Sequence, residues 1–287
     1  MKEIIKIERL VKRYGTKVAV DGLGLAVYRG EVFGFLGPNG AGKTTTVRVM
    51  STLADFNSGT VLINGHDIVK EPSKAKACLG MIQQQISLDK DLTVRENMKL
   101  HALYHKIPSA ERERRIDALA EYIGLTEYLD SMVDTLSGGW KKRAAIVCAL
   151  IHEPMILFLD EPTVGLDIRA RRLLWDIIRR LNSDGTTIFL TTHYIEEAEV
   201  LCDRVGIINR GKLIALGTPE ELCGRVGAVA VEYFHNGTNT QYRYFQDRND
   251  ANDFLASLPE GTTATVRKTN LEDSFVELTG ESVGGSR

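Results

Sequence analysis

The sequence predicts an α/β fold in which a parallel core sheet carries an antiparallel β subdomain and a helical insert, followed by a small C-terminal α+β domain. Continuous apolar runs at residues 32–36, 155–159 and 187–190 alternate with segments of helical periodicity. Such runs are typical of parallel strands that are buried on both faces. The expected boundaries are residues 1–224 for the main domain, 86–153 for its helical insert and 225–287 for the C-terminal domain.

The composition is that of a globular protein with a sizeable core. Of the 287 residues, 43% are hydrophobic and 26% are charged, as in ordinary globular domains. The net charge of -2 argues against a broad positive field, so no nucleic-acid partner is expected. The four cysteines are widely spaced, which predicts reduced thiols rather than a zinc site or disulfides. No run approaches the roughly 18 apolar residues of a membrane helix, so a membrane role would require a separate membrane protein.

The start of the chain is predicted to form antiparallel strands. Apolar residues alternate there with polar or small ones, which indicates short, half-buried strands containing Ile5, Ile7, Leu23, Leu25 and Val27. After a further strand at residues 61–63, Asn64-Gly65 is a strong hairpin signal. These elements make up the antiparallel subdomain. Between them, residues 32–36 lead into a glycine-rich turn and a helix that begins near Lys43.

The middle of the chain is predicted to be helical. Thr93 and Glu96 form a capping-box pattern that opens a helix through Leu103, and helical periodicity continues to His152. A later helix is expected to carry its apolar residues on one face: Leu173, Leu174, Ile177, Ile178 and Leu181. A short helix then opens at residues 218–221 (TPEE), where Pro takes the first position and Glu completes the cap.

The character of the sequence changes after Gly224. A β-ribbon is predicted from Val229, Val231, Tyr233, Tyr242 and Tyr244. It is followed by a helix around residues 253–258, a strand around Val266 and a helix containing Leu271, Phe275 and Leu278. These elements predict a small, separate α+β domain.

The glycine-rich turn matches the Walker A pattern and lies between a buried strand and a helix, as a phosphate cradle must. Its backbone amides and the positive end of the helix dipole would face phosphate oxygens. Lys43 would reach the β and γ phosphates and Thr44 would ligate magnesium. A chance match is expected in roughly one chain in a hundred of this length. The expected nucleotide-binding residues here are Gly37, Pro38, Asn39, Gly40, Ala41, Gly42, Lys43, Thr44 and Thr45.

Two adjacent carboxylates, Asp160 and Glu161, end the apolar run at residues 155–159. Beside a phosphate cradle, the first carboxylate is placed to bind magnesium. The second can polarise an attacking water molecule. Alone, the pair would more often be a solvated strand end, but the Walker A pattern reverses that preference.

A further motif is typical of one superfamily. Residues 136–139 (LSGG) resemble the signature that, among nucleotide triphosphatases, is found in the ABC superfamily. The family's other elements occur in the family's order along the chain: Tyr14 matches the adenine-stacking aromatic, Gln84 the Q-loop glutamine, Asp167 the D-loop and His193 the switch histidine. The resemblance covers roughly residues 3–224 and identifies the chain as an ABC transporter ATP-binding subunit.

The resemblance implies a head-to-tail dimer in which the P-loop of one subunit faces the signature of the other. ATP and Mg²⁺ would bind between them, with Lys43, Glu161 and His193 in the catalytic roles. Gln84 would contact the metal together with Thr44 and Asp160. Four signature residues would act on the nucleotide of the partner: Ser137, Gly138, Gly139 and Trp140.

Some of these assignments have alternatives. Tyr14 and His193 taken alone would more often be an ordinary aromatic and a structural histidine. Gln84 is chosen from residues 83–85 (QQQ) by counting back from Leu92. Trp140 stands where the family most often has Gln, and it could pack against the partner subunit or the nucleotide sugar.

Two segments narrow the resemblance further. Residues 192–199 (THYIEEAE) and 270–280 (NLEDSFVELTG) look like the daunorubicin-resistance and sodium-extrusion group of exporter ATPases. This likeness implies export of a drug, lipid, ion or other small substrate, with the chain peripheral on the inner, cytoplasmic face of the cell membrane. Its partners would be a second copy and an integral membrane permease. A soluble non-transport ABC ATPase and an importer ATPase are the alternatives.

Overall fold

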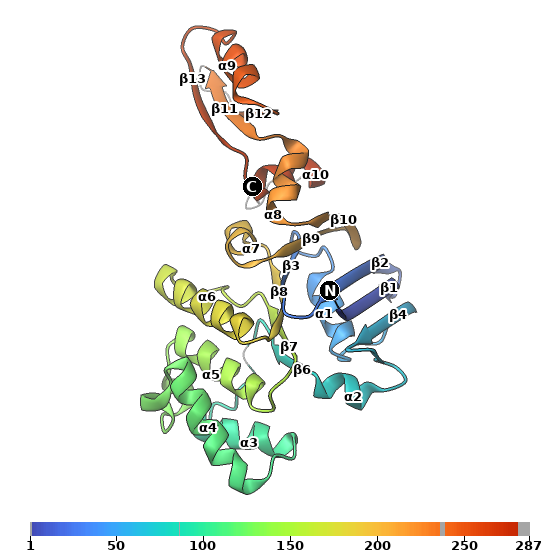
Figure 1. Ribbon diagram of the computed structural model, residues 1–287, viewed down its shortest axis with the longest axis vertical. Helices are drawn as coiled ribbons and strands as arrows, with labels where there is room; N and C mark the ends of the chain where they lie inside the picture. Colours follow the sequence, from blue (N-terminus) through green and yellow to red (C-terminus); the bar gives the residue numbers. More distant parts are fainter. Residues whose placement is uncertain (1, 86, 236–238, 281–287) are drawn as a thin grey trace.

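The computed structural model describes residues 2–85, 87–235 and 239–280. A central sheet lies between two parts at opposite ends of the long axis (Figure 1). One end is formed by α3 (Val94–Tyr104), α4 (Ser109–Ile123) and α5 (Gly138–Leu150), and the other by the C-terminal elements. Within the described residues, no helix is both long enough and apolar enough to span a bilayer.

The central sheet has the strand order β10-β9-β3-β8-β7-β6. Its strands are β3 (Val32–Leu36), β6 (Leu79–Ile82), β7 (Ile156–Asp160), β8 (Thr187–Thr192), β9 (Arg204–Asn209) and β10 (Lys212–Gly217). All neighbouring pairs are parallel except β9 and β10. The predicted parallel core sheet is therefore confirmed, with one antiparallel strand added at its edge.

Alternate residues of β7 enter different hydrophobic clusters. Leu157 and Leu159 pack with the helices of the insert, with α6 (Ile168–Ser183) and with α7 (Ile195–Leu201). Ile156 and Phe158 pack with α1 (Lys43–Met50) and the antiparallel subdomain. The strand is fully buried on both faces, as its uninterrupted apolar sequence predicts.

The antiparallel subdomain is a four-stranded sheet of order β2-β1-β4-β5. Its strands are β1 (Glu3–Tyr14), β2 (Lys17–Tyr28), β4 (Ser58–Ile63) and β5 (His66–Asp67). The expectation of short opening strands was wrong, because β1 and β2 each extend over 12 residues. Register shifts along β1 break the apolar alternation and hide this length in the sequence. Asn64 and Gly65 both have positive φ, at 49° and 83°, which confirms the predicted hairpin turn.

The helices begin where their capping residues place them. The capping boxes at Thr93 and Thr218 are both formed, the second opening α8 (Pro219–Val226). One expectation for α6 was wrong, since Leu173 is 41% exposed whereas Trp175 is buried. Leu174, Ile178 and Leu181 follow helical spacing and define the buried face of α6. Trp175 lies within this face, whereas Leu173 lies at its edge. A short helix, α2 (Pro72–Ala77), precedes β6.

The C-terminal elements form a three-stranded antiparallel sheet and two helices. The strands are β11 (Val229–His235), β12 (Gln241–Phe245) and β13 (Thr262–Lys268), with β11 in the middle. The helices are α9 (Arg248–Ala256) and α10 (Leu271–Thr279). The sequence placed α9 at residues 253–258, five residues too late at its start. The side chain of Asp247 accepts hydrogen bonds from two backbone amides and starts the helix earlier.

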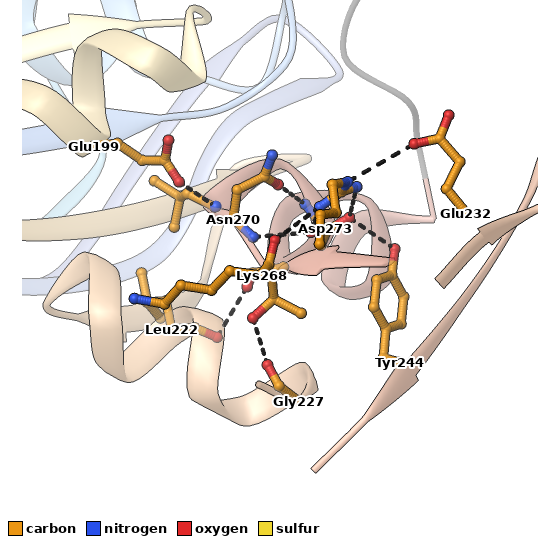
Figure 2. A network of polar contacts seen from close by, with 12 residues as sticks. Glu199, Leu222, Gly227, Glu232, Tyr244, Lys268, Asn270 and Asp273 are labelled. Atoms are coloured by element: carbon orange, nitrogen blue, oxygen red, sulfur yellow. Dashed lines mark hydrogen bonds and ion pairs between the residues drawn. The ribbon is translucent and has the colours of Figure 1, made fainter. Parts of the chain in front are cut away.

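A network of polar contacts joins α10 to the core (Figure 2). The Glu199 carboxylate, on α7, accepts a hydrogen bond from the Leu271 amide at 2.5 Å, at the start of α10. The Ser274 hydroxyl donates to the Leu222 carbonyl at 3.0 Å, on α8. Leu271 and Phe275 belong to the same buried cluster as the insert and the central sheet. Helix α10 is therefore packed on α7, the helix that follows His193.

Candidate functional site

A cavity of about 470 Å³ lies where the antiparallel subdomain meets the carboxyl end of the central sheet. It is lined by Tyr14, Lys17, Ala19, Asn39, Gly40, Gly42, Lys43, Thr44, Thr45, Gln84 and Glu161. Nine of these were expected from the sequence. Lys17 and Ala19 were missed, because they belong to β2 and enter the site only through the fold. No local motif marks either residue.

The glycine-rich loop has backbone positions that only glycine fits. A Cβ on Gly37 would lie 2.4 Å from the carbonyl oxygen of Ile208. A Cβ on Gly42 would lie 2.5 Å from the carbonyl oxygen of Ala19, and its φ of 115° also disfavours any other residue. The loop is thus pressed against β9 and β2. Lys43 begins α1 directly after Gly42, which places the amides of the helix start at the cavity.

Lys43 is a buried cation, with only 4% of its surface exposed. Its Nζ donates to the carbonyl oxygens of Gly37 at 2.8 Å and Pro38 at 3.3 Å. The same atom lies 3.3 Å from Glu161 Oε1. Burial lowers the pKa of Lys43, while the negative charges of Glu161 and Asp160 oppose that shift. An anion in the cavity would meet this ammonium group at close range.

The two carboxylates at the end of β7 face different partners. Asp160 is buried, and its Oδ1 accepts hydrogen bonds from the hydroxyls of Thr44 at 3.3 Å and Thr191 at 2.5 Å. Glu161 is also buried, and its backbone has a positive φ of 47°. The chain turns sharply between the two residues. Asp160 is therefore directed towards Thr44 and Glu161 towards Lys43.

Three segments distant in sequence converge on Glu161. Gln84 Nε2 donates to Glu161 Oε2 at 3.4 Å. His193 Nδ1 lies 3.3 Å from Glu161 Oε1, within ion-pair distance but without hydrogen-bond alignment. With Lys43, these contacts surround the carboxylate with one cation, one amide and one imidazole. Of the three candidate glutamines, Gln84 is the one that contacts Glu161.

The remaining predicted residues of the first cavity lie around its rim or beneath it. Tyr14 is 48% exposed, and Lys12 Nζ lies 4.6 Å from the centroid of its ring. Gly37, Pro38 and Ala41 belong to the same loop but do not line the cavity, and Ala41 is almost fully buried. An aromatic face is thus available to a planar group at the open end.

The predicted signature lines a different cavity of about 250 Å³. Its lining comprises Ser137, Gly139, Trp140, Lys142, Arg143, Leu166, Asp167, Arg169, Ala170, Leu173 and Leu174. No described residue lines both this cavity and the first one. Ser137 and Gly138 are exposed at the start of α5, and Asp167 caps α6 by accepting from the Ala170 amide at 2.8 Å. Within one chain, the signature does not contribute to the Lys43 cavity.

Trp140 packs within its own chain. Its ring centroid lies 4.1 Å from that of Tyr128, in the short turn Thr126–Tyr128. The Arg143 guanidinium lies 4.3 Å from the Trp140 ring centroid. The indole therefore contacts the insert that carries the signature, in addition to lining the second cavity.

A glycine-rich phosphate cradle before α1, with a buried strand ending in two carboxylates, defines a P-loop nucleotide triphosphatase. The family model described as "ABC transporter" matches residues 20–164. A second model, described as "AAA domain, putative AbiEii toxin, Type IV TA system", matches residues 133–197. The chain belongs to the ABC transporter ATP-binding family and is an ATPase of that type.

Curated relatives cover most of the chain. The Nod factor export ATP-binding protein I of Ralstonia nicotianae is 38% identical, over 98% of this chain and 95% of its own length. The linearmycin resistance ATP-binding protein LnrL of Bacillus subtilis is 42% identical, over 79% of this chain and 73% of its own. The daunorubicin resistance ATP-binding protein DrrA3 of Streptomyces coeruleorubidus is 43% identical, over 79% and 72% respectively.

Solved structures confirm the fold class. An ATP-binding subunit of an ABC transporter superposes with a TM-score of 0.70 at 30% identity, covering 77% of this chain and 92% of its own. The ATP-binding cassette MJ0796, solved as a dimer bound to ADP and Pi, gives a TM-score of 0.68 at 27% identity. That match covers 75% of this chain and 98% of the other.

Proposed function

We propose that this chain is the ATP-hydrolysing subunit of an exporter and that it works as a head-to-tail dimer beneath a separate membrane permease. The relatives named for linearmycin resistance, daunorubicin resistance and Nod factor export support the assignment to export. On this proposal the chain lies in the cytoplasm, on the inner face of the membrane. Its substrate would be a small molecule such as a drug, a lipid or an ion.

The Lys43 cavity would hold the nucleotide. The phosphate chain would lie against the amides at the start of α1, with Lys43 Nζ on the terminal phosphates. Adenine would stack on the exposed ring of Tyr14 at the rim. The contacts of Lys43 with two carbonyl oxygens are ones that phosphate oxygens can replace. A pre-placed buried ammonium group needs little rearrangement to bind them.

The site also fits a magnesium ion. Thr44 Oγ1 and Asp160 Oδ1 lie 3.3 Å apart beside the phosphate cradle, and oxygen atoms are the ligands that Mg²⁺ prefers. Thr44, Asp160 and the side-chain oxygen of Gln84 would hold the ion. It would neutralise charge on the phosphate oxygens.

Glu161 would serve as the general base. Its carboxylate would accept a proton from a water molecule aimed at the γ phosphate. Gln84 and His193 contact the two carboxylate oxygens separately, so together they fix the orientation of the group. His193 would also reach the γ phosphate. Loss of that phosphate on hydrolysis would remove the contacts that keep the site closed.

The single observation that carries the dimer is that the signature and the phosphate cradle line separate cavities of one chain. A lone P-loop covers one side of a triphosphate and leaves the other in water. A second copy could present Ser137, the amides at residues 138 and 139, and Trp140 to that open side. Asp167 lies in the same cavity wall and would join the interface. Excluding water there would strengthen each electrostatic contact with the γ phosphate.

The Glu161→Gln variant tests the proposal. The amide keeps the shape of the side chain but cannot accept the proton, so turnover should fall by about 10²-fold or more. ATP should then remain bound, and light scattering after gel filtration should show a dimer with ATP and magnesium. ADP serves as the control, because it lacks the γ phosphate and should leave a monomer.

A second variant locates the interface. Ser137→Glu in the Glu161→Gln background places a negative charge at the start of α5, where it would repel the phosphates of the partner's nucleotide. Dimerisation with ATP should be lost while ATP binding by the single subunit persists. A dimer that forms equally well in this double variant would remove the signature from the interface.

The division of the chain is also a proposal. Residues 1–224 would form the nucleotide-binding domain, with residues 86–153 as the helical insert; Ile86 lies outside the described residues. Residues 225–287 would form an accessory domain that regulates the ATPase or contacts the second copy. The hydrogen bond between Glu199 and the Leu271 amide supports a connection of that kind (Figure 2).

A further inference from the structure

Glu197 is a fully buried carboxylate for which the catalytic scheme above has no role. It lies on α7, four residues after His193, and none of its surface is exposed. Burying an ionisable group is costly unless other groups compensate for lost hydration. Its surroundings therefore need an explanation.

Only one of its two carboxylate oxygens has a hydrogen-bond partner. Trp175 Nε1, on α6, donates to Glu197 Oε1 at 3.2 Å. Oε2 is buried and has no well-aligned donor among the described residues. The Thr163 hydroxyl is also buried and has no well-aligned partner among them. Burial raises the pKa of Glu197, while Thr192, Trp175 and Thr163 act as nearby donors that lower it. The Thr163 hydroxyl, a donor, and Glu197 Oε2, an acceptor, thus lie close together without forming a well-aligned hydrogen bond.

Two cations from different helices, the buried Lys142 and the partly exposed Arg171, interact electrostatically with Glu197. Lys142, on α5, is 4% exposed, and its Nζ donates to the Gln83 carbonyl at 3.4 Å. Burial lowers the pKa of Lys142, and the charges of Asp160 and Glu197 oppose that shift. The charge of Arg171, on α6, also acts on Glu197, and its guanidinium is 4.9 Å from the Tyr194 ring centroid.

Each neighbour of Glu197 belongs to a segment with a proposed part in the ATP site. Lys142 lies on the helix that begins at the signature, and it touches the backbone beside Gln84. Thr163 lies between Glu161 and Asp167, and α6 begins directly after Asp167. Thr192 immediately precedes His193. One carboxylate therefore faces the signature helix, the D-loop and the histidine loop together.

We propose that Glu197 is a positioning residue for ATP hydrolysis, which sets the relative placement of the signature helix, the D-loop and His193. The inference rests on the proposed head-to-tail dimer, because two of these three segments would act on the partner's nucleotide. In the dimer, the Thr163 hydroxyl turns onto Glu197 Oε2 as the D-loop meets the second copy. The bond completes the pairing of both buried groups and fixes His193 at Glu161.

The physical basis is that buried charges interact strongly, because little water lies between them. Water screens surface pairs, but the buried carboxylate of Glu197 and the buried ammonium group of Lys142 interact through a medium of lower dielectric constant. A shift of any of the three segments changes that interaction. Misplacement of a catalytic group by about 1 Å can lower a rate by about 10²-fold. Glu197 therefore influences turnover without touching ATP.

The Glu197→Gln variant tests the proposal, with Glu199→Gln as the matched control on the same helix. The amide keeps the size of the side chain and an oxygen for Trp175, but removes the charge. We expect kcat to fall by about tenfold or more, with the ATP affinity of the single subunit and the thermal midpoint unchanged. Dimerisation of Glu161→Gln with ATP should weaken when Glu197→Gln is added. Glu199 accepts a hydrogen bond from the Leu271 amide on α10, and the amide of Glu199→Gln keeps an oxygen for that bond, so this variant should retain wild-type kcat.

Thr163→Val provides a second test that does not depend on Glu197→Gln folding. Removal of the hydroxyl should lower kcat without affecting ATP affinity, and its effect should not add to that of Glu197→Gln. A wild-type kcat in either folded variant, additive effects, or a loss of kcat that follows a loss of stability would overturn the proposal. Failure of the proposed function would look different, because the wild type would not hydrolyse ATP or Glu161→Gln would not dimerise.

Discussion

Glu161 has a backbone conformation that residues with a Cβ rarely adopt, with a φ of 47°. Such a conformation costs about 1 kcal/mol or more and persists only where the surroundings enforce it. The Glu161 amide donates to both the carbonyl and the hydroxyl oxygen of Thr191, at 3.0 and 3.1 Å. These bonds fix the peptide that directs the carboxylate towards Lys43. The orientation of the proposed base is thus set by its backbone.

Trp140→Gln separates packing from nucleotide contact. The indole pairs with Tyr128 and Arg143 of its own chain, so its loss should lower the free energy of unfolding by about 1–2 kcal/mol. ATP affinity of the single subunit should stay the same, because Trp140 does not line the Lys43 cavity. Urea denaturation and a nucleotide titration measure the two effects.

Tyr128→Leu is the matched control for this substitution. It should cost a similar amount, and the two changes together should cost less than their sum because they remove one shared contact. Lower ATP affinity of single subunits at wild-type stability would contradict the packing role. That result would indicate that the indole of Trp140 contacts the nucleotide instead.

At the scale of elements, the sequence predicts what local patterns determine. The phosphate cradle is recognised because strand, loop and helix follow one another within residues 32–50. The starts of α3 and α8 are found for the same reason, because Thr93 and Thr218 carry capping-box patterns. The early start of α9 was missed because Asp247 caps it without a box. Lys17 could not be placed in the site, since only the pairing of β1 with β2 brings it there.

The helical insert is joined to the sheet by a pair of stacked histidines. The rings of His105, after α3, and His152, after α5, lie 3.6 Å apart and almost parallel. His152 Nε2 contacts the Leu79 carbonyl at 2.9 Å, at the start of β6, so this nitrogen must carry the hydrogen. Nδ1 is buried and has no partner among the described residues. A second proton, on Nδ1, would be buried without an acceptor, so this site favours the neutral imidazole over the imidazolium.

This joint makes stability sensitive to acid. Burial lowers the pKa of His152 to about 4, and the charges of His105, His101 and Arg115 add to the effect. The ordinary value is 6.5, so the unfolded chain binds this proton first as the pH falls. The stabilising contribution is therefore complete above pH 6.5 and is lost as the pH falls towards 4.

His152→Gln should reduce this acid sensitivity, because the amide can donate to Leu79 and does not titrate. Urea midpoints measured from pH 7 to pH 4 should fall less steeply in the variant than in the wild type. Equal slopes would show that His152 does not titrate differently on unfolding.

At the scale of the whole molecule, one hydrophobic cluster extends from the insert through the central sheet to α10. It includes Leu125, Leu190, Leu222 and Phe275, which come from widely separated parts of the chain. The sheet β12-β11-β13 and α9 extend beyond it at one end (Figure 1). The sequence could not show this, since the pattern of α10 gives its apolar face but not the partner of that face. Truncation after Gly224 would uncover Leu222, and so would not remove the accessory elements cleanly.

Two Phe→Ala substitutions within the C-terminal elements distinguish a joined unit from a separate one. Phe275 is 1% exposed within the shared cluster, so Phe275→Ala should cost about 3–5 kcal/mol and lower the unfolding temperature of the core. Phe254, on α9, packs instead on Tyr233 and Phe245, at 5.3 and 5.4 Å between ring centroids. Phe254→Ala should therefore affect the core much less. Tryptophan fluorescence reports on the core, because Trp175 belongs to the same cluster and Trp140 packs against it. Scanning calorimetry records any second transition. If Phe275→Ala leaves the fluorescence transition unchanged and shifts only a separate one, α10 unfolds independently of α7, and the accessory elements have no firm connection to the helix that follows His193.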